Sequence, residues 1–439
     1  MKKLVVIIIS LLTLIYSCEK KPAGDDPFEV PEYRVSSFGN ERPNEITVAV
    51  NPINTDNVVI GSNLDWYYYS FTGGSTWTES NIESVSHGVW GDPVVMFDDQ
   101  GLVYYCHLSN PEGDAWVDRI VVQKSFTGGQ SWDDGVGIGL NGTKVQDKEW
   151  LAFDRSNSLY AGNMYISWTE FDEYGSPDPA DKTRIRFSYS ANQSDTWSEP
   201  IVISDTEGDC LDGDNTVEGA VPCVGNDGEV YIAWSGPEGI YFDRSLDGGQ
   251  SFGQDKIISD MPGGWAFDIP GIYRCNGMPF TVCDNSDSEY SGNIYVMWSD
   301  QRNGQGNTDI FIMKSENGGD TWSNRKMVNT DGTSTHQFFP NIVVDPVTGI
   351  LYIVYYDRSN TTGNATEIWI ARSDDGGDTF QNYMLSQHRF TPESDIFFGD
   401  YIDIDAYDGV IYSAWMEMLD RKMSVWVARL TDDDFDKLD

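Results

Sequence analysis

The sequence predicts an all-β protein, a seven-bladed β-propeller built from four-stranded blades. Three observations support this fold class. A short turn pattern occurs six times along the chain, and a pair of apolar strands recurs seven times. The chain also contains 43 glycines and 13% aromatic residues, a composition typical of many short strands joined by tight turns.

The repeated turn has Ser at its first position, usually two Gly in the middle, and Trp or Phe at its eighth position. Ser and Asp or Asn side chains accept hydrogen bonds from turn amides, and Gly adopts positive φ, so this pattern predicts a tight turn between two strands. The third position is Asp or Asn in four copies, whereas Thr72 and Thr127 are expected to bond more weakly. The six copies are Ser70–Trp77, Ser125–Trp132, Ser190–Trp197, Ser245–Phe252, Ser315–Trp322 and Ser373–Phe380.

Each turn follows an apolar strand, a second strand and a third strand that leads into the turn. Seven first strands are expected, one more than the turns, and they begin near Glu45, Pro93, Trp150, Gly219, Met278, Pro340 and Tyr401. The seventh unit has a third strand at 424–430 but no turn pattern and no fourth strand. We therefore expect residues 33–38 to supply that strand and close the ring, in a propeller domain spanning 32–432 with an acidic tail at 433–439.

The first residues have the pattern of a bacterial lipoprotein signal. Lys2 and Lys3 precede an apolar run, 4–16, which ends just before Cys18 and is shorter than the about 20 residues of a transmembrane helix. We expect a signal peptide at 1–17, lipid attachment at Cys18 and a flexible tether at 18–31. The protein would then be anchored in a bacterial envelope, at the outer membrane or cell surface.

The acidic composition restricts the expected partners. With 28 Lys and Arg against 70 Asp and Glu, the formal net charge is −42, which disfavours nucleic acid and leaves the lipid anchor as the contact with the membrane.

Five cysteines follow Cys18, and an oxidising compartment would favour disulfides. The expected pairs are Cys210 with Cys223 and Cys275 with Cys283, which would leave Cys106 buried and free, although sequence alone does not fix the connectivity.

No cofactor is required by the sequence. The oxygen-rich segment 205–215 offers ligands for a structural Ca²⁺, but it lacks EF-hand spacing, and a solvated or disulfide-tied loop is the other interpretation. Four histidines do not form a zinc-binding pattern.

The repeated turn resembles the Asp-box, or BNR repeat, of the sialidase (neuraminidase) superfamily. That resemblance implies a propeller and, for the enzymes, a glycosidase that seats a carboxylated sugar on three Arg and uses an Asp acid and a Tyr nucleophile. Sialidases have six blades, so a six-bladed ring is the alternative fold. The nearest match to their arginine motifs lies in the fifth unit, where Tyr273-Arg274 precedes Met278 and Asp300-Gln-Arg302 follows.

Candidate site residues lie before the first strands and after the second strands, segments that share one face of a propeller. This face is rich in the carboxylates, aromatic residues and arginines that carbohydrate chemistry uses. The candidate catalytic residues are Asp400, Tyr401, Asp92 and Glu149. The candidate substrate-binding residues are Arg274, Arg302, Arg358, Arg421, Trp90 and His336.

Two functions remain open at this point. The first is an exported glycan-acting hydrolase resembling exo-α-sialidases, with a sialylated or other acidic glycan as its substrate. The second is a non-catalytic lipoprotein propeller that binds glycan or protein. The same arginines can instead form salt bridges that tie neighbouring blades together.

Overall fold

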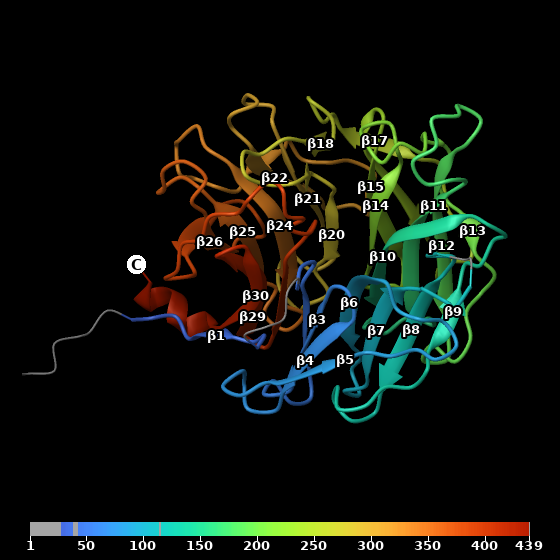
Figure 1. Cartoon of the computed structure of the whole chain (residues 1–439), viewed down its shortest axis with the longest axis horizontal. Helices are drawn as coiled ribbons and strands as arrows, with labels where there is room; N and C mark the ends of the chain where they lie inside the picture. The colour runs from blue at the N-terminus through green and yellow to red at the C-terminus, as the bar shows by residue number, and fades with distance from the viewer. Residues whose placement is uncertain (1–27, 38–42, 114–115, 439) are drawn as a thin grey trace, which may run out of the picture.

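The computed structural model describes residues 28–37, 43–113 and 116–438 of the 439-residue chain. These residues form a ring of seven four-stranded antiparallel sheets (Figure 1). The inner strands of all seven blades line one central channel. The ring confirms the predicted all-β, seven-bladed propeller and excludes the six-bladed alternative.

Six blades use four consecutive strands each, numbered from the channel outward. The first blade is β2 to β5 (Thr47–Val50, Val58–Ser62, Trp66–Ser70, Thr78–Asn81), and the second is β6 to β9 (Gly91–Phe97, Val103–Leu108, Ile120–Ser125, Val136–Ile138). The third is β10 to β13 (Val145–Phe153, Met164–Phe171, Thr183–Ser190, Ile201–Val202), and the fourth is β14 to β17 (Glu218–Val224, Val230–Gly236, Gly239–Ser245, Lys256–Ser259). The fifth is β20 to β23 (Phe280–Cys283, Ile294–Asp300, Asp309–Ser315, Lys326–Met327), and the sixth is β24 to β27 (Gln337–Val344, Leu351–Asp357, Glu367–Ser373, Gln381–Met384).

The seventh blade combines the two ends of the described chain. Its strands are β28 (Asp403–Tyr407), β29 (Val410–Leu419), β30 (Lys422–Thr431) and β1 (Glu32–Arg34). Tyr33 lies opposite Val427, and the pairing continues past β1, where the Val35 amide donates to the Val425 carbonyl at 2.8 Å. The expected closing strand is therefore confirmed.

The six turns share one hydrogen-bond pattern. In every copy the amide four residues after the first Ser donates to that Ser Oγ, at 2.8–3.1 Å. The amide four residues after the third position donates to its side-chain oxygen, at 2.8–3.0 Å. Thr72 and Thr127 make this bond at 3.0 Å, the same length as Asn192, so the expected weakening is not seen in the geometry.

Large aromatic side chains fill the spaces between blades. Trp168, Trp234, Trp298 and Trp415 occupy second strands and are fully buried. Burying aromatic side chains of this size is a major contribution to a propeller's stability. The inner strands are thereby held as a rigid frame for the loops at the ends of the channel.

Two elements lie outside the predicted repeat. A small sheet of β18 (Ala266–Phe267) and β19 (Cys275–Asn276) lies, in chain order, between the fourth and fifth blades. The acidic tail forms a 3₁₀ helix, η1 (Asp432–Lys437), which buries Phe435 against Tyr352 at 5.6 Å between ring centroids. The single aromatic residue among the aspartates explains why this segment docks on the ring.

The expected export signal and most of the tether lie in residues 1–27, outside the described residues. Within the described ranges, no helix is both long and apolar enough to cross a bilayer.

Candidate functional site

The inner strands begin at one end of the channel, and several begin with a β-bulge. The register shifts after Gly91, Asp147, Glu218 and Phe338, in four different blades. Positive φ accompanies the irregularity, at 53° for Asp92, 54° for Lys148 and 48° for Phe339. Such backbone is uncommon in residues other than Gly, and bulges re-aim side chains next to functional sites.

Nine ionisable side chains gather at this end of the channel, and we call them the mouth cluster. Seven are acidic and two are basic: Glu45, Asp92, Asp147, Glu149, Asp212, Glu218, Asp400, Lys148 and Arg274. Of the predicted site residues, the structure therefore brings Asp92, Glu149, Arg274 and Asp400 together. The sequence also held a signal for Glu45, Asp147, Lys148 and Glu218, which precede the inner strands expected from the sequence, but none of this kind for Asp212.

Lys148 and Arg274 hold Asp400 between them. The Lys148 Nζ lies 2.6 Å from Asp400 Oδ2 and 3.5 Å from carboxylate oxygens of both Glu45 and Asp92. The Arg274 Nε donates to Asp400 Oδ1 at 3.0 Å, and its Nη1 donates to Asp212 Oδ2 at 3.0 Å. Burial alone would raise the pKa of Asp400, but the two cations hold that pKa well below its usual range. Asp400 is therefore ionised at neutral pH.

Other carboxyl groups of the mouth cluster are shifted in the opposite direction. Burial, followed by the charge of Asp92, raises the pKa of Asp147 to about 7. Burial also raises the pKa values of Glu149 and Glu218 well above their ordinary value, with the charges of Asp92 and Asp212 as the next largest causes. Within the described structure the Oε2 atoms of both Glu residues are buried without a hydrogen-bond partner. Carboxyl groups with raised and with lowered pKa values thus share one site.

Tyr401 packs beneath the mouth cluster. Its hydroxyl donates to the Pro93 carbonyl at 3.2 Å, its ring lies edge-on to Trp150 at 5.7 Å, and Lys148 Nζ lies 5.5 Å from its ring centroid. Burial raises the pKa of this phenol well above its ordinary value. A hydroxyl bonded to a backbone carbonyl is not prepared to act as a nucleophile, so the position of Tyr401 does not support the role that we expected for it.

The remaining predicted arginines do not converge on Arg274. Arg302 is ion-paired with Asp300 and donates to the Asp260 carbonyl at 3.0 Å. Arg358 is buried and donates to Thr366 Oγ1 at 3.1 Å and to the Pro270 carbonyl at 2.7 Å. The expected three-arginine seat for one anion is therefore not formed.

Arg421 and His336 also lie apart from the mouth cluster. Arg421 is exposed on the rim, where its Nη2 lies 2.7 Å from Asp395 Oδ2. His336 Nδ1 lies 2.9 Å from the Thr308 hydroxyl, and burial lowers the pKa of this imidazole to about 4.

An aromatic row leads away from the mouth cluster, and we define it as Trp90, Trp116 and Tyr174. Trp90 and Trp116 are 37% and 44% exposed, and the centroids of their rings are 5.8 Å apart, edge to face. Trp116 contacts Tyr174 in the same way at 5.9 Å, and the Tyr174 hydroxyl donates to Asp212 Oδ2 at 2.6 Å. The predicted ligand-binding Trp90 is therefore connected to the mouth cluster through aromatic contacts.

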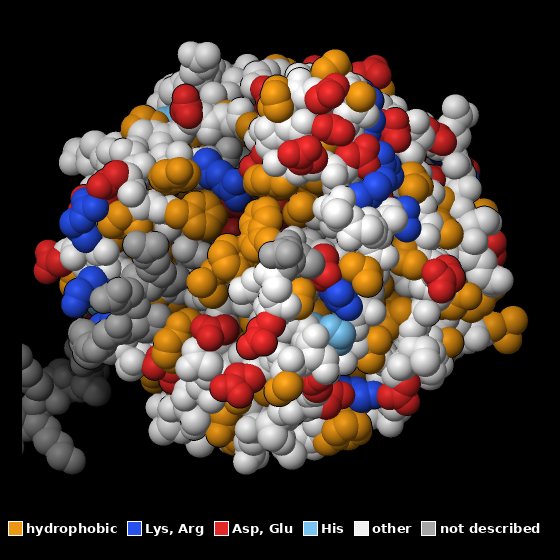
Figure 2. All heavy atoms as spheres, turned by 45° about the vertical axis from the view of Figure 1, so that its right-hand side comes forward, with side chains coloured by type: hydrophobic (Ala, Val, Ile, Leu, Met, Phe, Trp, Pro, Cys, Tyr) orange, Lys and Arg blue, Asp and Glu red, His pale blue; other side chains and the backbone are white. Residues whose placement is uncertain are grey.

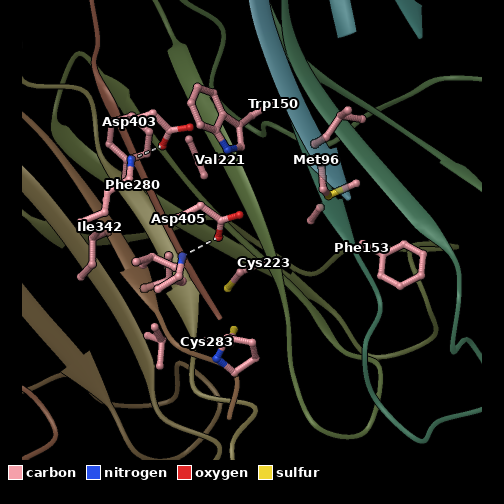
Figure 3. A pocket seen from close by; sticks show the side chains of 18 of the residues that line it. Met96, Trp150, Phe153, Val221, Cys223, Phe280, Cys283, Ile342, Asp403 and Asp405 are labelled. Atoms are coloured by element: carbon pink, nitrogen blue, oxygen red, sulfur yellow. Dashed lines mark hydrogen bonds between the residues drawn. The ribbon is translucent and has the colours of Figure 1, made fainter. Parts of the chain in front are cut away.

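One face of the molecule is mixed in character. In Figure 2 acidic side chains are spread over the visible face, Lys and Arg side chains lie beside several of them, and hydrophobic side chains gather near its middle. A small cavity of about 40 Å³ is bounded by Asp92, Lys148, Glu149, Asp400 and Tyr401 together with apolar neighbours. The channel itself forms a larger cavity of about 240 Å³ (Figure 3).

The five described cysteines are all free thiols, so neither expected pair, Cys210 with Cys223 or Cys275 with Cys283, is formed. Cys275 donates to the Asn276 carbonyl at 3.8 Å, and buried Cys106 donates to Glu149 Oε1 at 3.8 Å.

In the segment expected to offer calcium ligands, the carboxylates bond to other groups. Asp209 accepts from the Leu211 amide at 3.1 Å and Asp214 from the Ala266 amide at 2.9 Å. Among the described residues, no group of three or more His, Cys, Asp or Glu side chains is arranged to hold a metal ion.

No protein-family model and no curated protein sequence matches the chain. Solved structures do resemble it. The K499G mutant of the NanB sialidase from Streptococcus pneumoniae is 8% identical with a TM-score of 0.50, covering 86% of this chain and 84% of that one. A Trypanosoma rangeli sialidase bound to the inhibitor DANA is 13% identical with a TM-score of 0.48, over 93% of this chain and 61% of that one. A Dyadobacter fermentans protein of unknown function is 14% identical with a TM-score of 0.49, over 79% of this chain and 98% of that one.

The NanB sialidase, with a TM-score of 0.50, confirms the resemblance to sialidases at the level of the fold. At such low identity the likeness is one of fold alone, and the chemistry of the mouth cluster has to be argued from its own residues.

Proposed function

We propose that the protein is an exported, sialidase-like glycan hydrolase whose active site is the mouth cluster. One observation carries the proposal: ionised Asp400 and protonatable Asp147 occupy the same site, together with Lys148 and Arg274. Enzymes that cleave glycosidic bonds need one carboxylic acid and one carboxylate, kept in different protonation states by their surroundings.

Each role is assigned from exposure and charge. Asp147 protonates the leaving oxygen, because its pKa of about 7 leaves it partly protonated at neutral pH. Asp400, which Lys148 and Arg274 keep ionised, is the second carboxylate. Arg274, whose side chain is 42% exposed, hydrogen-bonds the sugar, and the aromatic row stacks on sugar rings.

The substrate class is a glycan, and the charge of the site bears on which one. The resemblance to sialidases suggests a sialylated or other acidic glycan. The seven acidic groups of the mouth cluster outnumber its two basic groups, which favours a neutral sugar instead. A panel of fluorogenic α-sialosides and neutral glycosides distinguishes these two substrate classes. If the protein hydrolyses no member of the panel, the proposal is contradicted.

Replacing Asp147 with Asn should lower kcat/KM about 10²- to 10⁴-fold, since the general acid is lost. In the unchanged protein, activity should fall as the pH rises through about 7. Asp268→Asn, which changes an exposed carboxylate outside the mouth cluster, is the matched control and should retain activity. Equal activities of the two variants would remove Asp147 from the mechanism.

The same Asp147→Asn variant has a separate stability readout. The pKa of Asp147 is raised in the folded state, so its carboxyl group favours folding at acid pH and loses that contribution as the pH rises from about 4 through about 7. We therefore compare the free energy of unfolding of the variant with that of the unchanged protein. The difference should favour the variant more at pH 8 than at pH 4. Denaturant titrations at both pH values measure this difference independently of any substrate.

A non-catalytic glycan-binding propeller is the second candidate. It is favoured by the ion pairs that engage Arg274 with Asp212 and Asp400, and Arg302 with Asp300. Retention on a glycan array without turnover of any glycoside in the panel would support this function.

We further propose that the protein is a lipoprotein anchored to the bacterial envelope through Cys18, because this residue ends the apolar export segment. Replacing Cys18 with Ala should move the protein from the membrane fraction to the soluble fraction. Cys106→Ser is the control and should stay with the membrane. Retention of the Cys18→Ala variant in membranes would contradict lipid anchoring.

A further inference from the structure

Two cysteines lie in neighbouring inner strands of the channel wall. Cys223 belongs to β14 of the fourth blade, and Cys283 is the last residue of β20 in the fifth blade. The blades are joined at this level, because the Ala233 amide of β15 donates to Thr281 Oγ1 of β20 at 3.2 Å.

Strand periodicity brings the two cysteines to the same level. Ala233 lies opposite Val221 in β14, so Thr281 of β20 is level with Val221. Cys283 and Cys223 each follow two residues later in their strands. Because side chains two residues apart share a face, Cys283 points toward the fourth blade as Thr281 does. This register is independent of any property of the thiols themselves.

The surroundings of the two thiols agree with this register. Cys223 and Cys283 belong to one hydrophobic cluster between the blades, together with Tyr231, which lies opposite Cys223. After burial, the neighbouring Cys223 thiol is the next cause that raises the pKa of the Cys283 thiol. Both residues line the channel, and Figure 3 shows them at the same end of this cavity.

We propose that Cys223 and Cys283 are a site of disulfide formation that covalently joins the inner strands of the fourth and fifth blades. The oxidant is a small-molecule disulfide such as oxidised glutathione. Cys283 loses its proton to solvent, and its thiolate attacks one sulfur of the oxidant, so that the S–S bond of the oxidant breaks and the first thiol leaves. Deprotonated Cys223 then attacks the mixed disulfide and releases the second thiol. The two cysteines are oxidised, the oxidant is reduced to two thiols, and these thiols take up the two protons.

The bond is tested on the full-length protein. The protein is incubated with oxidised glutathione at mildly alkaline pH, because burial raises the pKa of the Cys283 thiol. Remaining thiols are then alkylated under denaturing conditions, and the protein is digested and mapped by mass spectrometry. A peptide that links Cys223 to Cys283 is the expected result.

Matched variants make the result decisive. The linked peptide should disappear in Cys223→Ser and in Cys283→Ser and persist in Cys106→Ser. The melting temperature should rise on oxidation in the unchanged protein but not in Cys283→Ser. Alkylation of both cysteines after oxidation, a link to Cys210 or Cys275 instead, or glutathione held by either residue as the end product would each overturn the proposal.

Discussion

Replacing Lys148 with Met is expected to lower the free energy of unfolding by about 3–5 kcal/mol, as when one partner of a buried ion pair is removed. The Lys148 side chain is only 9% exposed and neutralises Asp400, with Glu45 and Asp92 close by. Without the ammonium group, these acidic groups face one another with Arg274 as the remaining cation of the mouth cluster. Urea titration at neutral pH measures the loss.

Lys256→Met is the matched control for this experiment. Lys256 is 45% exposed and forms an ion pair of 3.7 Å with an exposed carboxylate, an interaction worth little in water. We expect this control to change stability by less than about 0.5 kcal/mol. The deficit of Lys148→Met should also shrink at acid pH, because protonation of Asp400 removes uncompensated charge. If both Lys→Met variants lose the same free energy of unfolding, then Lys148 does not stabilise the mouth cluster.

Removal of residues 1–40 is expected to cause a large loss of stability, together with aggregation. Without β1, strand β30 loses its outer partner, and the backbone bond from Val35 to Val425 is lost. Val30 and Val35 are 6% and 7% exposed, and each contributes about 1.5–3 kcal/mol through its burial. An open strand edge also invites pairing between molecules.

A chain that lacks only residues 1–27 is the control, because it keeps β1. Melting temperature and light scattering compare the two truncated proteins. Equal melting temperatures would mean that β1 does not hold the ring closed.

The fold was predictable because the information that specifies a blade is local. Each eight-residue turn forms its hydrogen bonds within its own residues, as in Ser245–Phe252. The strands that lead into the turns recur at regular intervals along the chain. The closing strand could be predicted by counting the strands of each unit, because the seventh unit lacked a fourth strand. The tail was predicted less well, because the burial of Phe435 against Tyr352 depends on a neighbouring blade.

The candidate site was predictable only in part, because its contacts join different blades. The rule that functional residues precede inner strands led to Asp92, Glu149 and Asp400, which the structure places in one cluster. It could not reveal that Lys148 reaches Asp400 across the channel mouth. Arg302 was misjudged for a simpler reason, because its partner Asp300 is two residues away in the same segment.

The disulfide pairs expected from the sequence failed for the same reason. Closeness along the chain suggested Cys275 with Cys283, whereas the register between two blades brings Cys283 to Cys223. Register between strands of different blades is set by packing and cannot be read from the spacing of cysteines.

The pairing of β1 with β30 has a consequence for folding during synthesis. Tyr33 is among the first described residues to leave the ribosome, and its partner Val427 is among the last. The ring cannot close until β30 has been synthesised, and contacts so distant in sequence form slowly. Until then the unfinished blade exposes an unpaired strand edge, the kind of surface that makes folding intermediates prone to aggregate. The unfinished chain is therefore most prone to aggregate before β30 has paired with β1.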